Sequence, residues 1–340
     1  MSENKQAKNE GAFLQVKDLV VEYTSEGDIV HAVNGVSFEL EHGKTLGLVG
    51  ETGAGKTSIA KTILRILPEF NAAIKQGTVI LDGEDLYQIS EAKMETIRGA
   101  KISMIFQDPM TALNPVKTVG DQIFEAIYLH NDGISKKDAM ERAMQMLEMV
   151  NIQRERYFEY PHQFSGGMKQ RVVIAMALAC NPELLLADEP TTALDVTIQA
   201  QVLEMIRDLR AKFNTAMILI THDLGVIAET CDEVAVVYAG EIVEYGSLRD
   251  VFKSMSHPYT KGLFEALPDI DRDVKRLHSI KGLPVDPTNL PAGCKFAERC
   301  NYATEECFKK SIPLQKMGEK HYSRCIHADV VLKEVKGSAA

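Results

Sequence analysis

The chain has 340 residues, 45% of them hydrophobic and 25% charged, and its formal net charge is −10. This length is enough for one large domain with an appendage. The chain is acidic and contains no block of consecutive basic residues, so we do not expect nucleic acid as its main ligand. The longest apolar run, Val172–Cys180, is too short for a membrane span, which needs roughly 18 apolar residues.

The beginning of the chain is polar and lacks the basic-then-apolar order of a secretory signal. Residues 1–11 have no periodic apolar positions, so we expect them to form a disordered lead-in. We also expect the chain to stay inside the cell, where thiols remain reduced, and therefore expect no disulfides among its six cysteines.

The segment from Phe13 to Leu40 alternates as strands do, with a turn at "TSEGD", and predicts an antiparallel start. After it, helical patterns alternate with short apolar runs, namely "TLGLVG", "KISMIF", "ELLLAD", "AMILIT" and "EVAVVYAG". Continuous apolar runs of this kind are typical of strands buried on both faces of a parallel sheet. The sequence therefore predicts an α/β core joined to an antiparallel β subdomain.

The strand signal disappears between Pro115 and Pro161, which predicts a helical insert over about residues 115–165. Apolar side chains recur there at helical spacing, at Met140, Ala143, Met144, Leu147 and Val150. We interpret these methionines as core packing of an amphipathic helix, not as an adaptable binding face. Beyond Ser256 prolines become frequent and most of the cysteines follow, which predicts a domain boundary there.

The stretch "GETGAGKT" fits the pattern G-x-x-x-x-G-K-[ST] and lies between an apolar strand and a helix. Glycines let backbone N–H groups approach phosphate oxygens, and the helix N-terminus adds the positive end of its dipole. Lys56 is predicted to reach the β- and γ-phosphates of ATP, and Thr57 to ligate Mg²⁺. The predicted phosphate-binding segment, the P-loop, consists of Gly50, Glu51, Thr52, Gly53, Ala54, Gly55, Lys56 and Thr57, followed by Ser58.

A second pattern, "LLLADEP", is a buried strand that ends in two adjacent carboxylates. Because neighbouring residues on a strand point to opposite sides, the two carboxylates can divide their roles. Asp188 is predicted to hold Mg²⁺, directly or through water, and Glu189 to act as the general base on the attacking water.

A third pattern, "FSGGMKQR", precedes an apolar helix. Alone it is an ordinary helix N-cap, but its position before the carboxylate strand makes it informative. With these patterns in the chain order P-loop, signature, carboxylate strand, the chain resembles the nucleotide-binding subunits of ABC transporters, and the resemblance spans about residues 13–256. It implies a nucleotide-binding domain over residues 12–255, a C-terminal extension over 256–332 and a tail over 333–340.

The resemblance also implies further nucleotide-facing residues. Tyr23 matches the adenine-stacking aromatic, Gln107 in "IFQDP" the residue that senses Mg²⁺, and His222 in "ILITHD" the switch histidine. The remaining counterparts are Ser165, Gly166, Gly167 and Gln170 of the signature and Asp195 of "TTALD". The catalytic group implied in this way is Glu189, His222 and Gln107. Phe164 and Met168 depart from the commonest signature, L-S-G-G-Q.

Within this family, the signature of one subunit faces the P-loop of another, so that two cassettes enclose two ATP molecules. The stretches "IFQDPMTALNP", "HPYT" and "LPAGCKFAERC" resemble the dipeptide, oligopeptide and nickel importer branch. This resemblance implies three kinds of partner: a second homologous ATPase, two integral-membrane permeases and an extracytoplasmic peptide-binding protein. It also implies that the chain is peripheral, at the cytoplasmic face of the cell membrane. Peptides are the expected cargo, and nickel complexes are the alternative.

The extension carries Cys294, Cys300, Cys307 and Cys325, spaced as C-x5-C-x6-C-x17-C. Structural zinc sites typically use closer pairs, and spacing alone leaves open whether a 4Fe-4S cluster or Zn²⁺ is bound, with His321 and His327 as substitute zinc ligands. The resemblance to the importer branch favours the 4Fe-4S cluster, and unligated cysteines are a third possibility. We interpret Cys180 and Cys231 as small core residues.

Two other classes of protein compete with a transporter subunit. Soluble ABC ATPases of DNA repair carry long coiled coils between the P-loop and the signature, whereas only a helical segment intervenes here. An iron-sulfur redox protein with an incidental P-loop is opposed by the complete set of ATPase motifs. The sequence therefore predicts an ATPase coupled to peptide import.

Overall fold

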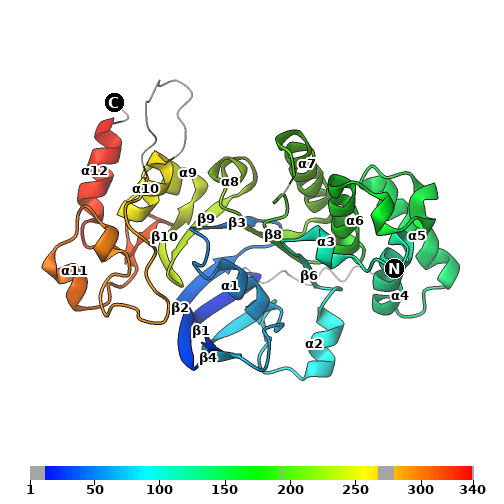
Figure 1. Ribbon diagram of the computed structural model, residues 1–340, viewed down its shortest axis with the longest axis horizontal. Coiled ribbons are helices and arrows are strands. Elements are labelled where there is room, and N and C mark those ends of the chain that lie inside the picture. Colours follow the sequence, from blue (N-terminus) through cyan, green and yellow to red (C-terminus); the bar gives the residue numbers. More distant parts are fainter. Residues whose placement is uncertain (1–11, 193, 267–278, 339–340) are drawn as a thin grey trace, which may run out of the picture.

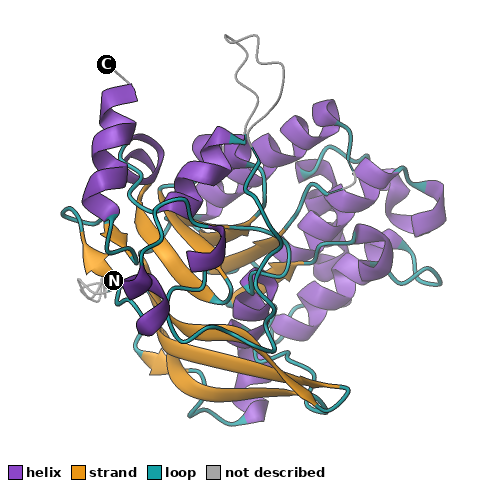
Figure 2. Cartoon of the chain, turned by 60° about the vertical axis from the view of Figure 1, so that its left-hand side comes forward, coloured by secondary structure: helices purple, strands orange, loops and turns teal. Residues whose placement is uncertain are grey.

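The computed structural model describes residues 12–192, 194–266 and 279–338, so the predicted lead-in over 1–11 lies outside the described residues. Two β-sheets form the framework (Figure 1). In Figure 2 the antiparallel sheet lies below the main sheet, and most of the helices lie above and beside the two. The predicted α/β fold with an antiparallel subdomain is confirmed.

The smaller sheet contains four antiparallel strands in the order β2-β1-β4-β5. Its strands are β1 (Leu14–Ser25), β2 (Asp28–Leu40), β4 (Ala72–Leu81) and β5 (Glu84–Asp85). Between β1 and β2, Glu26 and Gly27 have φ values of 53° and 97°. Two positive φ values in succession are those of a type I′ turn, whose twist matches that of the flanking strands.

The larger sheet has the order β11-β12-β10-β9-β3-β8-β7-β6. Five of its strands run parallel: β6 (Ile102–Ile105), β7 (Leu184–Asp188), β8 (Ala216–Ile220), β3 (Thr45–Val49) and β9 (Glu233–Tyr238). Successive side chains of these strands are buried on opposite faces, which explains their continuous apolar sequences. Leu184 and Leu186 belong to one core, whereas Leu185 and Ala187 belong to the other.

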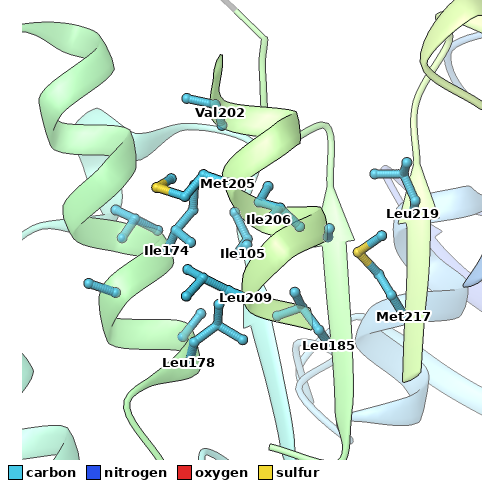
Figure 3. Packing of buried hydrophobic residues seen from close by; sticks show 14 of the residues in the cluster. Ile105, Ile174, Leu178, Leu185, Val202, Met205, Ile206, Leu209, Met217 and Leu219 are labelled. Carbon is cyan, nitrogen blue, oxygen red and sulfur yellow. The ribbon is translucent and has the colours of Figure 1, made fainter. Parts of the chain in front are cut away.

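Helices cover the larger sheet, and α1 lies between it and the antiparallel sheet (Figure 1). Their bounds are α1 (Lys56–Ile63), α2 (Glu91–Ile97), α3 (Pro109–Ala112), α4 (Val119–His130), α5 (Lys136–Met149), α6 (Gly166–Leu178), α7 (Val196–Phe213), α8 (Leu224–Thr230), α9 (Leu248–Lys253), α10 (Pro258–Glu265), α11 (Glu305–Lys309) and α12 (Ala328–Ser338). Figure 3 shows one core, where Ile174 of α6 and Met205 of α7 approach Leu185 of β7.

The region predicted as a helical insert contains α4, α5 and two short 3₁₀ helices, Arg154–Phe158 and Pro161–Gln163. Ala143, Leu147 and Val150 are buried in the core that contains α6, and Met140 and Met144 pack against it. The methionines therefore pack the core, as the sequence predicts.

The C-terminal extension continues the main sheet. Strand β10 (Glu241–Ser247) pairs with β12 (Tyr322–Ser323), which pairs with β11 (Gln315–Lys316). Beneath this pairing the fully buried carboxylate of Glu244 accepts four hydrogen bonds: from Ser256 N at 2.7 Å, Ser256 Oγ at 2.9 Å, His257 N at 3.0 Å and His321 Nε2 at 2.8 Å. A buried carboxylate needs such donors, so this network ties the extension to the core.

We predict that Glu244→Gln destabilises the protein by about 3 kcal/mol, because the new amide turns N–H groups toward N–H donors inside the core. Chemical denaturation of the whole chain measures the change in the free energy of unfolding. The control is Glu305→Gln, at a side chain that is 90% exposed, which should leave the free energy of unfolding unchanged. An unchanged free energy in Glu244→Gln would contradict the role given to the network.

Candidate functional site

The candidate site lies at one edge of the larger sheet, where the five parallel strands end. The P-loop begins directly after β3, Glu189 directly after β7, Gln107 two residues after β6 and His222 two residues after β8. Because parallel strands present their carboxyl ends at the same edge, residues far apart in sequence meet there.

The P-loop needs glycine at two positions for steric reasons. Gly50 has a φ of 155°, and a Cβ atom there would lie 2.1 Å from the carbonyl oxygen of Val237. Gly55 has a φ of 99°, and its Cβ would lie 2.2 Å from the carbonyl oxygen of Ala32. The loop is therefore pressed against the neighbouring strands in a shape that no larger residue allows.

Lys56 is folded into the P-loop, with only 6% of its surface exposed. Its Nζ atom donates to the carbonyl oxygens of Gly50 at 2.7 Å and Glu51 at 2.9 Å. Burial lowers the pKa of Lys56, although the carboxylates of Glu189, Asp188 and Glu51 oppose this shift. A cation held in this way is already positioned for an anionic ligand of the loop.

Thr57 and Asp188 form a polar pair beside Lys56. Thr57 Oγ1 donates to Asp188 Oδ1 at 3.1 Å, and Asp188 is only 2% exposed. Burial raises the pKa of Asp188 above its ordinary value, and the hydrogen bond from Thr57 opposes this shift. A buried carboxylate next to a hydroxyl is an oxygen donor set that suits Mg²⁺.

The carboxylate of Glu189 contacts three other side chains of the site. Its Oε2 atom accepts from Thr192 Oγ1 at 2.8 Å and from Gln107 Nε2 at 3.1 Å, and its Oε1 atom lies 3.4 Å from His222 Nδ1. Burial alone would raise the pKa of Glu189, but the hydrogen bonds with Thr192 and His222, together with the charges of His222 and Lys56, lower it below its ordinary value. The carboxylate is therefore kept charged and able to accept a proton.

The backbone of Glu189 has a φ of 47°, an uncommon value for a residue other than glycine. Its N–H group donates to the carbonyl oxygen of Ile220, at the end of β8, over 2.9 Å. This bond holds the strained turn that brings the Glu189 side chain to Gln107 and His222. Tyr23, at the other side of α1, lies with its hydroxyl 3.2 Å from Ser58 Oγ.

The signature residues lie elsewhere in the chain. Ser165 caps α6 and accepts a hydrogen bond from Met168 N at 3.4 Å. Helix α6 packs against α3, α4, α5, α7 and β6, whereas α1 packs against β2, β7 and β8. A Cβ atom on Gly166 would meet nothing within 4 Å, while one on Gly167 would lie 2.7 Å from Ile198. One chain therefore presents its signature and its P-loop as two separate surfaces.

Two predicted site residues make internal contacts. Gln170 is buried and donates from Nε2 to the carbonyl oxygen of Pro190, so it links the signature helix to the segment after Glu189. Asp195 caps α7 by accepting from Ile198 N at 3.0 Å.

The two unusual signature residues share one partner, Arg156. Its guanidinium carbon lies 4.2 Å from the centre of the Phe164 ring, and its Nη1 atom lies 3.4 Å from Met168 Sδ. A guanidinium over an aromatic face is an attractive contact. Phe164 and Met168 therefore anchor Arg156 of the helical insert beside the start of α6.

Some functional contacts were not predicted from the sequence. Thr192 donates a hydrogen bond to Glu189, three residues before it in "DEPTTALD". A hydroxyl so close to the predicted base was the one sequence feature that could have indicated this contact. The Glu51 side chain points to the extension, where Arg299 donates to both of its oxygens, at 2.7 and 3.0 Å. No local pattern signals a contact between residues 248 positions apart.

The predicted 4Fe-4S cluster, and the alternative Zn²⁺ site, are wrong. Among residues 12–192, 194–266 and 279–338, no group of three or more His, Cys, Asp or Glu side chains is arranged to hold a metal ion. All four cysteines of the extension are free. Burial raises the pKa of Cys300 to about 11 and that of Cys325 to about 12.

These thiols have other partners. Cys300 Sγ accepts from Tyr302 N and Cys325 Sγ accepts from His327 N, each at 3.3 Å. Cys294 and Cys300 also pack against the larger core cluster. The cysteines of the extension therefore serve in packing and turns, as small apolar residues do.

Two family models match the chain. The ABC transporter family matches residues 33–192, and the oligopeptide/dipeptide transporter C-terminal region matches residues 243–307. The first covers the P-loop through Glu189, and the second covers β10 and most of the extension.

Known proteins resemble nearly the whole chain. An oligopeptide transport ATP-binding protein, OppD of Bacillus subtilis, is 48% identical over 93% of this chain and 89% of the relative. A dipeptide transport ATP-binding protein, DppD of the same organism, is 51% identical over 84% of this chain and 86% of the relative.

A solved structure supports the same assignment. The dimeric post-hydrolysis state of an ATP-binding cassette with ADP and Pi has a TM-score of 0.63 and 26% identity, and the match covers 69% of this chain and 99% of that chain. The site geometry, the family models and these relatives agree. This chain therefore belongs to the ATP-binding proteins of the oligopeptide and dipeptide branch of the ABC transporter family.

Proposed function

We propose that this chain hydrolyses ATP to power the import of di- and oligopeptides through a membrane ABC transporter. One observation carries the proposal: a single chain joins the Glu189-centred site to an extension that matches the oligopeptide/dipeptide C-terminal region. The relatives are named for oligopeptide and dipeptide transport, which favours peptides over the nickel complexes of the alternative prediction.

The partners are a second homologous ATPase, two integral-membrane permeases and an extracytoplasmic peptide-binding protein. No helix in the described ranges is long and apolar enough to cross a membrane. The chain acts peripherally, at the cytoplasmic face, through permeases that provide the membrane-spanning part. In this role, residues 12–255 serve nucleotide binding, with the helical insert at 115–165, and residues 256–332 form the extension. Its last helix, α12, continues to Ser338, within the segment predicted as the tail at 333–340.

The ATP site is completed by two chains. The signature of this chain, Ser165–Gly167, begins α6, whose main contacts are with other elements than those of α1, and a solved relative is dimeric with ADP and Pi. The signature residues of one ATPase therefore face the P-loop of the other, and ATP phosphates join the two helix N-termini. Tyr23 stacks on the adenine, and Asp195 lies at the interface between the two ATPases.

The P-loop residues Gly50–Thr57 and Ser58 hold the ATP phosphates through backbone N–H groups, with Lys56 as the cation. The donor set of Thr57 and Asp188 fits Mg²⁺, and the raised pKa of Asp188 shows a buried carboxylate that a cation would stabilise. Gln107 uses its amide nitrogen on Glu189, which leaves its amide oxygen for the metal. Bound Mg²⁺ neutralises charge on the β- and γ-phosphates.

Glu189 accepts a proton from the water that attacks the γ-phosphorus, and the bond from phosphorus to the ADP oxygen breaks. His222 lies beside Oε1 of Glu189 and is 68% exposed, so it is free to contact the γ-phosphate and orient the water. Gln170, buried against the carbonyl oxygen of Pro190, transmits the position of the signature helix to the segment that carries Glu189.

Gln107 also connects the site to the permeases. It lies between Glu189 and α3, and α3 packs against the signature helix α6. The helical insert that follows α3 carries exposed apolar side chains, with Val116 79% and Leu129 70% exposed. We assign permease docking to the helical insert, because exposed apolar groups mark interaction surfaces.

We predict that Glu189→Gln lowers phosphate release by the assembled transporter by about a hundredfold or more while ATP still binds and holds the two ATPases closed. The amide cannot accept the proton of the attacking water. The matched control is Glu183→Gln, at the amino-terminal side of β7, which should retain activity. Undiminished phosphate release by Glu189→Gln would overturn the general-base assignment.

A second prediction concerns pH. Thr192→Val removes a hydrogen bond that favours the charged form of Glu189, so the pKa of Glu189 rises. The acidic limb of the kcat profile then moves to higher pH, because the base becomes protonated earlier as pH falls. Thr192→Ser keeps the hydroxyl and should keep the wild-type profile. A profile in Thr192→Val that coincides with wild type would contradict this role of Thr192.

A further inference from the structure

Glu51, the second residue of the P-loop, takes part in interactions from two directions. Within the loop, its carbonyl oxygen accepts from Lys56 Nζ at 2.9 Å and from Ala54 N at 3.2 Å. Toward the extension, its N–H group donates to Tyr259 OH at 2.9 Å and its carboxylate binds Arg299. One residue therefore connects the phosphate-binding lysine with the C-terminal extension.

The contact between Arg299 and Glu51 is bidentate. Nη1 donates to Oε2 at 2.7 Å and Nη2 donates to Oε1 at 3.0 Å, while only 6% of the Arg299 side chain is exposed. Nε of Arg299 is occupied by the carbonyl oxygen of Lys281, at 3.0 Å. A guanidinium with all three nitrogens directed in this way has a fixed orientation, and paired hydrogen bonds are stronger than a single ionic contact.

The contacts of Arg299 and Tyr259 with Glu51, which we call the clamp, are supported by an aromatic cluster. Tyr259 is fully buried, and its ring centre lies 4.7 Å from that of Tyr238 and 5.3 Å from that of Phe296. The guanidinium carbon of Arg299 lies 5.7 Å from the centre of the Tyr238 ring and 5.8 Å from that of Phe296. Tyr238 ends β9, so the cluster fixes Tyr259 and Arg299 to the same sheet edge that carries the P-loop.

The extension touches the first half of the P-loop in further places. Pro284, Val285 and Pro287 face Thr52–Ala54 across a cavity of about 150 Å³. Pro287 O also accepts a hydrogen bond from His31 N on β2, at 2.9 Å. The extension therefore frames residues 51–54, while the second half of the loop leads into α1.

From this geometry we propose that Arg299 and Tyr259 are positioning residues for ATP: through Glu51, the C-terminal extension holds the P-loop and sets its affinity for nucleotide. The inference rests on the proposed ATP contacts of Lys56 and the loop. If Glu51 lost its contacts with Arg299 and Tyr259, its carbonyl oxygen would shift. Lys56 and the neighbouring N–H groups would then become ordered only when ATP binds, and the free-energy cost of this ordering would weaken ATP binding. Because neither residue contacts Glu189, ATP binding is affected and the chemical step is not.

The test uses the complete transporter with both ATPases and its permeases. Equilibrium ATP binding, KM and kcat are measured for Arg299→Gln, Glu51→Gln, the double variant and Lys56→Ala. We expect each of the first two to weaken ATP binding about tenfold, which is ~1.4 kcal/mol. In Arg299→Gln, whose side chain lies outside the P-loop, kcat should stay nearly unchanged. The double variant should bind ATP as a single one does, because the two side chains act on the loop as a pair. Arg299→Lys should lie between wild type and Arg299→Gln, because it keeps the charge without the fork.

The matched control is Lys261→Gln. Lys261 Nζ donates to Tyr302 OH at 2.8 Å and Glu334 Oε2 at 2.7 Å, so the variant loosens α12 without touching the P-loop, and its ATP affinity should remain that of wild type. An equal loss of affinity in Lys261→Gln and Arg299→Gln would overturn the clamp in favour of a general effect of the extension.

Unchanged ATP affinity in Arg299→Gln and Glu51→Gln, with affinity lost in Lys56→Ala, would overturn the clamp alone. Unchanged affinity in Lys56→Ala as well would overturn the proposed ATP site itself. Thermal unfolding of each variant identifies any that fail to fold, and Tyr259→Phe, which removes only the hydroxyl acceptor of the Glu51 N–H group, then serves as the independent probe of the same contact.

Discussion

The site depends on one constraint, the common edge formed by the carboxyl ends of five parallel strands. Each strand delivers a different group to that edge: the P-loop after β3, Gln107 after β6, Glu189 after β7, His222 after β8, and Tyr238 at the end of β9. The strands are buried on both faces, so their register is fixed by packing. Groups separated by more than a hundred residues are thereby held within hydrogen-bonding distance, as Thr57 and Asp188 are.

Protein contacts hold the C-terminal extension to the ATPase core. The buried Glu244 accepts hydrogen bonds from Ser256, His257 and His321, which joins β10 to the far end of the extension. Arg299 and Tyr259 bind Glu51 from the other side. Phe296 of the extension is buried in the core cluster of the main sheet. The extension and the ATPase core are therefore packed against each other.

The sequence was informative where function depends on local geometry. The P-loop glycines, the strand ending in Asp188 and Glu189, and the continuous apolar strands each carry a short pattern with one physical meaning. It was uninformative where function depends on distant pairing. Thr192 and Arg299 belong to frequent residue types, and nothing in the neighbouring sequence marks them. Only the fold shows that Thr192 contacts Glu189 and that Arg299 contacts Glu51. The cysteine spacing misled because it fits both a metal site and a set of free thiols, and only the arrangement of the side chains within the described residues distinguishes the two.

The central claim is that ATP hydrolysis at the Glu189 site drives peptide import, and one measurement tests it most directly. The chain is assembled with its partner ATPase and permeases in vesicles, with the peptide-binding protein on the extracytoplasmic side, and ATP hydrolysis and peptide uptake are followed together. The account predicts that peptide-loaded binding protein stimulates hydrolysis and that peptide accumulates only while ATP is consumed. Hydrolysis that is insensitive to peptide, with no uptake, would contradict the account.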